Sequence, residues 1–148
     1  MIALQAILVV EDNDEDFETV VEAAQKGGVR NPLRRATCGD TGLHMLQACV
    51  LSHSPLPALV LLDLNTPAGD GRDALRQIKQ DDRLRVIPTV VLSTSANPRD
   101  VDFCHANHAN AYHAKPVSHT AHLKILQDIF SYWLASALPP VVQTPGKK

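Results

Sequence analysis

A run of four apolar residues, Leu59–Leu62, leads directly into the carboxylate of Asp63 and then into a turn-rich stretch over residues 65–71. A continuous apolar run bounded by turn residues is typical of a strand buried on both faces, as in a parallel sheet. Asp63 should then lie at the carboxyl edge of that sheet, where open α/β sheets bind their ligands. Taken alone, the carboxylate could equally well cap the next helix. The other strands and polar residues of the chain favour a ligand site.

Short apolar runs alternate with segments of helical period along most of the chain. Strands are predicted at Ile7–Val10, 33–37, Leu59–Leu62, 87–92 and Ala111–Ala114. A helix is predicted after each strand, with Asp40 and Asn97 as N-caps of the second and fourth, and the last helix runs from about residue 120 to 137. This alternation predicts an α/β fold of the (βα)5 type, a doubly wound five-stranded parallel sheet with helices on both faces.

Charge and hydropathy exclude several classes of protein. The 148 residues carry 14 Lys and Arg against 16 Asp and Glu without a basic stripe, which argues against nucleic acid as a partner. No apolar run approaches the ~20 residues of a membrane span, and the apolar N-terminus lacks the basic start of a signal peptide. Three widely spaced cysteines fit a reducing compartment. We therefore expect a cytoplasmic protein with one domain over residues 1–138, a tail over 139–148, no separate output domain and no membrane partner.

Polar residues suited to chemistry stand at the predicted carboxyl ends of four strands. They are Glu11, Asp12, Asp63, Ser93 and Lys115. Right-handed crossovers bring these strand ends to one edge of the sheet. Crowded carboxylates repel one another unless a cation is present, and Mg²⁺ with its oxygen ligands suits such a site. A lysine and a hydroxyl beside the cation suit an incoming phosphoryl group, for which a carboxylate can be the nucleophile.

The order and spacing of these motifs resemble those of two-component response-regulator receiver domains. The matching positions are Glu11 and Asp12, the loop 63–67 with Gly71, Ser93 five residues after Pro88, Tyr112, and Lys115 with Pro116, whose peptide bond is usually cis in that family. The resemblance covers roughly residues 5–137. It implies a flavodoxin-like fold and a signalling protein that is not an enzyme, apart from slow loss of its own phosphoryl group.

The resemblance also implies a role for each acidic residue. Asp63 would accept the phosphoryl group from a phosphohistidine of a sensor histidine kinase. Asp12 and Asp63 would bind Mg²⁺ directly, the backbone carbonyl of Asn65 would be a third ligand, and Glu11 would act through a metal-bound water.

Three further residues would bind the phosphoryl group or respond to it. Lys115 would pair with a phosphoryl oxygen, Ser93 would move toward the phosphate, and Tyr112 would turn inward to fill the space that Ser93 leaves. Thr94 is the alternative to Ser93, but the spacing to Pro88 favours Ser93. The coupled shift of hydroxyl and aromatic ring is the two-state element that the phosphate would bias.

Within the family, the chain is similar to the single-domain regulators that pair with bacterial phytochrome histidine kinases. The similarity is carried by residues 11–13, by residues 81–88 and above all by the ending at 130–140. Regulators of that type often have Pro where this chain has Asp14. The similarity implies a bacteriophytochrome as the kinase.

The alternative function from another class is an aspartyl phosphatase of the haloacid dehalogenase type. That family uses an Asp-x-Asp-x-Thr pattern at a strand end, and residues 63–66 are superficially close to it. Asn65 occupies the place of the second Asp, and an amide cannot serve as the general acid. The receiver is therefore the favoured interpretation.

The last predicted helix carries a wide apolar face. Leu123, Leu126, Phe130 and Trp133 form one stripe, with a second stripe beside it. A helix lying on a sheet needs only one such stripe, so the extra surface indicates a homodimer through this helix and the ending after it. The alternative is that residues 139–148 fold back over the stripe.

Overall fold

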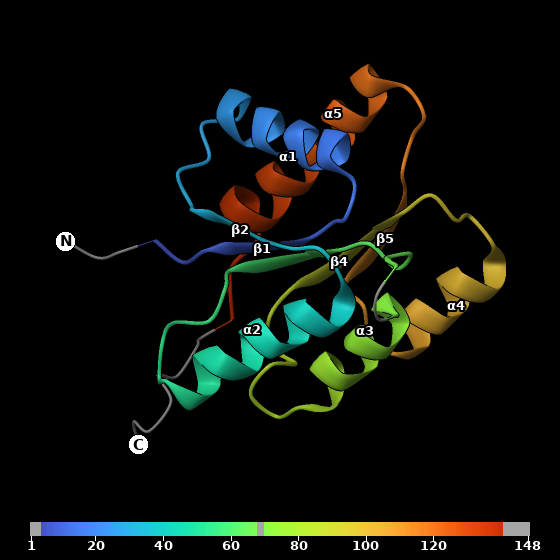
Figure 1. Ribbon diagram of the computed structural model, residues 1–148. Helices are drawn as coiled ribbons and strands as arrows, with labels where there is room; N and C mark the ends of the chain where they lie inside the picture. Colours follow the sequence, from blue (N-terminus) through green and yellow to red (C-terminus); the bar gives the residue numbers. More distant parts are fainter. Residues whose placement is uncertain (1–3, 68–69, 141–148) are drawn as a thin grey trace.

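The computed structural model describes residues 4–67 and 70–140, and these form one parallel sheet between two layers of helices (Figure 1). The sheet order is β2-β1-β3-β4-β5. The strands are β1 (Ile7–Val10), β2 (Leu33–Ala36), β3 (Leu59–Leu62), β4 (Thr89–Ser93) and β5 (Ala111–Ala114). This is the flavodoxin-like order, whose topological switch point lies between β1 and β3. The predicted fold class is confirmed. Of the tail expected over 139–148, residues 141–148 lie outside the described residues.

Five α-helices connect and follow the strands. They are α1 (Asp14–Lys26), α2 (Gly39–Leu51), α3 (Gly71–Gln80), α4 (Pro98–Ala106) and α5 (His119–Phe130), and α5 continues into the π-helical turn η1 (Ser131–Ser136). Helices α1 and α5 cover one face of the sheet, and α2, α3 and α4 cover the other (Figure 1). None of the described helices is long and apolar enough to cross a membrane.

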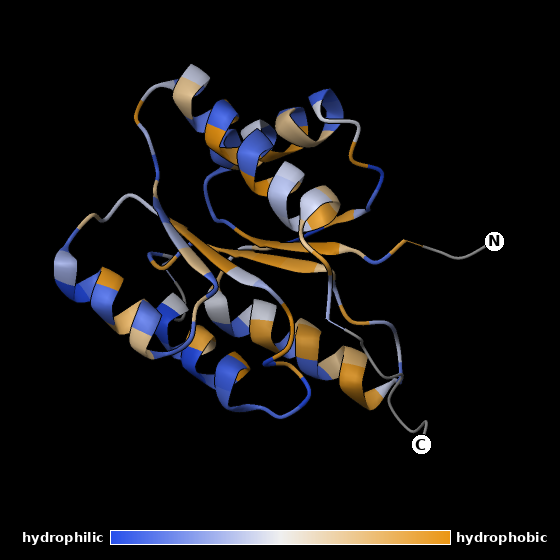
Figure 2. Ribbon diagram, turned by 180° about the vertical axis from the view of Figure 1, so that it is seen from behind, coloured by the Kyte–Doolittle hydropathy of each residue, from blue (hydrophilic) through white to orange (hydrophobic). Residues whose placement is uncertain are grey.

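Strands β1 and β3 are apolar throughout because both of their faces are covered. Leu8 and Val10 belong to the core cluster beneath α2, α3 and α4, whereas Ile7 and Val9 belong to the cluster beneath α1 and α5. Successive residues of a strand point to opposite faces, so an unbroken apolar run fills both cores at once. Figure 2 shows this arrangement at the centre of the sheet, where the hydrophobic strands lie between the two layers of helices.

Two helix boundaries differ from the sequence prediction. The N-cap of α2 is Cys38, whose backbone is extended, and Asp40 lies inside the first turn, where a carboxylate suits the positive end of the helix dipole. The last helix leaves the α geometry after Phe130 and ends as η1. A π-helical turn has no local sequence signature that propensity could have revealed.

The predicted dimer face on the last helix needs correction. Leu126 and Phe130 are 0% and 2% exposed and lie in the core cluster that includes Val20 and Ala23 of α1. Because α5 packs against both the sheet and α1, it needs a wider apolar face than a helix that covers a sheet alone. These two side chains are therefore part of the chain's own core. Leu123 and Trp133 are half-buried against the same cluster.

Candidate functional site

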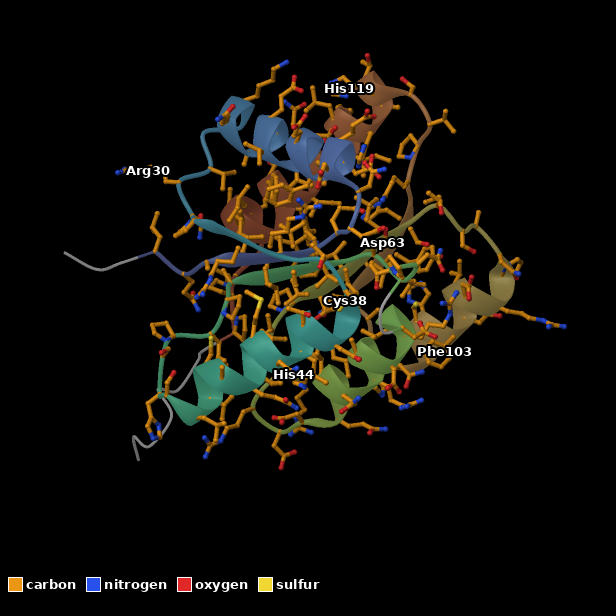
Figure 3. All side chains as sticks on the ribbon, viewed as in Figure 1. Arg30, Cys38, His44, Asp63, Phe103 and His119 are labelled. Carbon is orange, nitrogen blue, oxygen red and sulfur yellow. The ribbon has the colours of Figure 1, made fainter. Side chains whose placement is uncertain are left out.

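The carboxyl ends of the two strands beside the switch point meet at one edge of the sheet. Glu11 and Asp12 follow β1 directly, and Asp63 follows β3. The Asp63 N–H donates to the carbonyl of Val10 at 3.1 Å, which ties the two strand ends together. Figure 3 shows Asp63 at this edge, near the loops that lead to α3 and α4. The fold thus brings the acidic residues after β1 and β3 to the same edge of the sheet, as the sequence predicted.

Gly71 lets the loop after Asp63 return tightly against its own strand end. Its N–H donates to the carbonyl of Leu64 at 3.1 Å. A Cβ atom at this position would lie 2.6 Å from the carbonyl oxygen of Asp63 and 2.7 Å from the Cα of Leu64. Both neighbours are backbone atoms that cannot easily move, so only glycine fits this turn.

Three carboxylates form a compact cluster at the sheet edge. Glu11, Asp12 and Asp63 each offer one carboxylate oxygen, and these oxygens all lie within 4.8 Å of one another. Glu11 and Asp63 are buried, whereas Asp12 is exposed. Burial raises the pKa of Glu11, and its hydrogen bond to Lys115 offsets this only in part. An acidic, oxygen-only donor set with one side open to solvent fits a hard divalent cation that retains several waters.

Lys115 follows β5 and extends its ammonium into the acidic cluster. Its Nζ donates to Glu11 Oε1 at 2.8 Å, to Asp16 Oδ2 at 2.9 Å and to Asp63 Oδ2 at 3.3 Å. Burial of this side chain opposes its charge, but the hydrogen bonds to Glu11 and Asp16 outweigh burial and hold the pKa of Lys115 above its ordinary value. The lysine is therefore charged at neutral pH and positioned beside Asp63.

The backbone around Lys115 differs from the family resemblance in one respect. No cis peptide bond occurs among the described residues, so the bond between Lys115 and Pro116 is trans. The trans isomer is the more stable one for most X-Pro bonds. The Lys115 N–H donates to the carbonyl of Ser93 at 2.6 Å, which holds the end of β5 beside the end of β4.

Ser93 ends β4 with its hydroxyl inside the protein. The residue is 0% exposed, and Asn65 Nδ2 donates to its Oγ at 3.3 Å. The backbone N–H of Asn65 donates to Asp63 Oδ1 at 3.0 Å, so Asn65 connects the hydroxyl to the carboxylate. Thr94 is exposed. The geometry thus brings Ser93, and not Thr94, to the interior side of the site.

Tyr112 connects β5 to the loop before α4. Its ring is half-buried against the core, and its hydroxyl donates to the carbonyl of Ser95 at 2.6 Å. The Ser95 hydroxyl donates to Asp100 of α4 at 2.6 Å, and Arg72 of α3 donates to the same carboxylate at 2.7 Å. These bonds form a continuous chain from α3 through α4 to Tyr112. The sequence singled out Tyr112 but not Arg72 or Asp100, because the pairing of these two residues depends on how α3 and α4 lie relative to each other.

Asp16 is the site residue that sequence reasoning missed. It lies in the first turn of α1 beside Asp14 and Glu15, where acidic residues are expected simply as a favourable interaction with the helix dipole. No sequence signal separates Asp16 from Asp14 and Glu15, because which of the three reaches Lys115 depends on how α1 packs.

Comparisons with known proteins agree with this geometry. The model of the response regulator receiver domain matches residues 7–127. The chain belongs to the response regulator receiver family. Among curated relatives of this receiver, response regulator Rcp1 of Synechocystis is 37% identical over 137 residues, covering 92% of this chain and 93% of Rcp1. The probable methanogenesis regulatory protein FilR2 of Methanothrix harundinacea is 37% identical over 128 residues, covering 86% and 83%.

Solved structures place the receiver close to regulators of phytochrome signalling. The Mn²⁺-bound form of Rcp1 has a TM-score of 0.86 at 37% identity, covering 93% of this chain and 99% of that one. The phosphorylated cyanobacterial phytochrome response regulator RcpA has a TM-score of 0.82 at 34% identity, covering 94% and 100%. The receiver is thus related to single-domain phytochrome response regulators, and the phosphatase alternative has no support.

Proposed function

We propose that Asp63 accepts one phosphoryl group from a phosphohistidine of a sensor histidine kinase, and that the receiver acts as a signalling switch. The observation that carries this proposal is the buried Asp63 carboxylate, which lies 3.3 Å from the ammonium of Lys115 within an acidic cluster. A nucleophile, a cationic partner for the transferred group and a set of cation ligands are the three parts that phosphoryl transfer to a carboxylate requires.

In this reaction a carboxylate oxygen of Asp63 attacks phosphorus and forms the new P–O bond. The P–N bond to the kinase histidine breaks, and the imidazole leaves with the electron pair and takes up a proton. Lys115 donates a hydrogen bond to a phosphoryl oxygen, and the Ser93 hydroxyl, which accepts from Asn65 in this structure, moves toward the phosphoryl group and donates to another oxygen. Tyr112 then follows the movement of the loop after β4. Slow hydrolysis of the acyl phosphate would restore the resting state.

The proposed cation is Mg²⁺. Asp12, Asp63 and the backbone carbonyl of Asn65 would hold it, and Glu11 would hold one of its waters. The cation would neutralise charge on the transferring phosphoryl group. The spacing of the carboxylate oxygens and the openness of the cluster on the Asp12 side support this assignment.

A bacteriophytochrome is the proposed kinase partner. The support is the similarity to Rcp1 and RcpA along nearly the whole chain. A cytoplasmic location and a receiver boundary near residue 138, with a tail after it, belong to the same proposal.

The decisive experiment is phosphorylation with acetyl phosphate and Mg²⁺, followed by mass measurement of the intact chain and of its peptides. We expect one phosphoryl group per chain, located on Asp63. Continuous turnover of p-nitrophenyl phosphate without accumulation of a label would instead indicate a phosphatase. Transfer from a phosphorylated bacteriophytochrome, compared with an unrelated histidine kinase, tests the proposed partner.

Removal of the divalent cation gives a prediction that depends on pH. A ligand that binds only the folded state stabilises it, so Mg²⁺ should raise the Tm of the cation-free protein. Because the pKa of Glu11 is raised, protons compete with the cation at a higher pH than at an ordinary carboxylate. We therefore expect the Mg²⁺-dependent rise in Tm to shrink as the pH falls toward that pKa. Thermal melts with and without Mg²⁺ across pH measure the effect, and Glu11→Gln should reduce its pH dependence.

Glu11 also affects the stability of the cation-free protein. Its pKa is higher in the folded state than the ordinary value of 4.5, so the folded state binds more protons than the unfolded state between those two pKa values. The stabilisation of the folded state by protonated Glu11 is therefore fully present below about pH 4.5. It is lost as the pH rises through the pKa of Glu11 in the folded state. Unchanged pH dependence in Glu11→Gln would contradict this assignment.

We still propose a homodimer, but its contact surface is now η1 and not the buried face of α5. Tyr132 is 55% exposed and packs edge-to-face on Trp133 at 4.9 Å, and Leu138 is 95% exposed. We expect Tyr132→Glu to lower the sedimenting mass to that of a monomer, because a charge at the centre of an apolar contact is costly. Thr120→Glu, which changes an exposed position at the other end of α5, is the control. Equal masses for both variants and the unmodified protein would contradict this dimer surface.

A further inference from the structure

Lys115 donates to three carboxylates, and the proposed reaction gives a further role to only some of them. An ammonium has three N–H donors, and Lys115 directs them to Glu11, Asp16 and Asp63. Any new hydrogen bond from Lys115 to a phosphoryl oxygen must therefore replace a bond that the structure already contains. The partners of Lys115 can be separated into those that have another task in the reaction and those that do not.

Two of the partners have a second task. Glu11 and Asp63 both belong to the cluster whose oxygens lie within 4.8 Å and could hold a cation, and Asp63 is also the proposed nucleophile. Asp16 is not in that cluster. When Glu11 and Asp63 turn toward the cation and the phosphoryl group, Asp16 is the partner that can continue to hold the ammonium.

The position of Asp16 is fixed by the start of α1. Asn13 caps this helix, and its side-chain oxygen accepts from the Asp16 N–H at 2.9 Å. The neighbouring acids are directed elsewhere, because Asp14 pairs with Arg35 at 2.8 Å and Glu15 is exposed. Of the three consecutive acids, only Asp16 contacts Lys115 among the described residues.

The surroundings of Asp16 on the side of α5 leave its carboxylate available to Lys115. His122 is 4% exposed, and its Nδ1 lies 4.0 Å from Asp16 Oδ1, which is beyond hydrogen-bond distance. Burial lowers the pKa of His122, so its ring is neutral at pH 7 and does not draw the carboxylate away as a cation would. Asp16 is 29% exposed in its side chain, so the ion pair with Lys115 is partly shielded from water and well formed at 2.9 Å.

We propose that Asp16 is a positioning residue that keeps the Lys115 ammonium directed at Asp63 while Glu11 and Asp63 exchange their bonds to it for bonds to the cation and the phosphoryl group. This inference rests on the proposed function. It assigns a part in the reaction to α1, whereas Glu11 and Asp12 reach the site from the end of β1.

The test compares Asp16→Ala with Glu15→Ala. Both variants remove one negative charge from the first turn of α1, but only Asp16 contacts Lys115. At saturating Mg²⁺ and acetyl phosphate, we expect the rate constant for labelling Asp63 to fall about tenfold in Asp16→Ala, the effect of losing one charge-assisted hydrogen bond, and to stay near the unmodified value in Glu15→Ala. Asp16→Asn retains a side-chain acceptor, so it should lose less than Asp16→Ala.

Binding of beryllium fluoride in the presence of Mg²⁺ gives a second readout that involves no turnover. Its affinity should fall in Asp16→Ala by a factor similar to the labelling rate, while the affinity for Mg²⁺ alone should match that of Glu15→Ala. Urea unfolding of each variant reports whether the fold is intact.

The possible failures are distinguishable. If the unmodified protein takes up no label at Asp63, the proposed function is wrong and this inference is wrong with it. If the unmodified protein is labelled and Asp16→Ala behaves like Glu15→Ala in both rate and beryllium fluoride affinity, the inference alone is overturned. Equal losses of Mg²⁺ affinity and labelling rate in Asp16→Ala would also overturn it, because Asp16 would then be acting on the cation.

Discussion

Replacing Asp63 with Asn is expected to abolish phosphoryl labelling completely. The amide is a poor nucleophile, and no other carboxylate takes the same position between Lys115 and the end of β3 among the described residues. The substitution changes neither the size of the side chain nor its ability to accept from the Asn65 N–H. We therefore expect an intact fold and no label when the intact mass is measured after incubation with acetyl phosphate and Mg²⁺.

Asp12→Asn is the matched control for this prediction. It removes an equal charge from the same cluster but leaves Asp63 in place. We expect labelling to slow by about 100-fold, the usual effect of losing one element of electrostatic stabilisation, and the label still to be found on Asp63. A stoichiometric label in Asp63→Asn would mean that the acceptor is a different residue.

The largest change in stability is expected for Phe130→Ala. Phe130 is 2% exposed in the core between α1, α5 and the sheet, so its removal leaves a cavity as well as losing buried apolar surface. We expect the free energy of unfolding to fall by about 3–5 kcal/mol. Urea unfolding followed by far-ultraviolet circular dichroism measures this change.

Tyr132→Ala distinguishes core from surface at the end of the same helix. Tyr132 is 55% exposed and its ring contact is the edge-to-face pair with Trp133, so in the dilute, monomeric protein we expect its truncation to lower the free energy of unfolding by about 0.5–1.5 kcal/mol. If Phe130→Ala instead altered the sedimenting mass and left the unfolding free energy unchanged, Phe130 would be an interface residue, as the sequence alone had suggested.

These two residues illustrate what the sequence could reveal about the last helix. The apolar positions of α5 were recognised correctly, but their partners were not, because periodicity reports which face is apolar and not what covers it. The missing fact was tertiary: α1 lies against α5 on the same face of the sheet (Figure 1). A helix with two neighbours needs a wider apolar face, and the stripe that includes Leu126 and Phe130 was interpreted as an intermolecular surface.

The strands were more predictable than the helix ends. Ile7–Val10, Leu59–Leu62 and Ala111–Ala114 match the structure at both boundaries. The first two are buried parallel strands, which are short apolar runs with clear turn residues after them. The fourth strand begins at Thr89, two residues later than predicted. The preceding residues 87–88 instead end the loop that brings the chain back from α3.

The site residues that follow strands could be predicted from the sequence, whereas Asp16, which lies in a helix, could not. Topology alone brings Glu11, Asp63 and Lys115 to one edge of the sheet. Which of three consecutive acids in α1 reaches Lys115 depends on the rotation and tilt of that helix, and the sequence contains no measure of either. The roles assigned to these residues in phosphoryl transfer remain predictions.

Ser95 has a consequence for how this molecule could communicate. The Ser95 carbonyl accepts a hydrogen bond from the Tyr112 hydroxyl, and the Ser95 hydroxyl donates to Asp100. One small residue therefore links the half-buried Tyr112 ring to α4. A displacement of Ser95 would therefore break both hydrogen bonds at once. A partner that contacts only the outer surface of α4 would therefore respond to the position of the half-buried Tyr112 ring without contacting it.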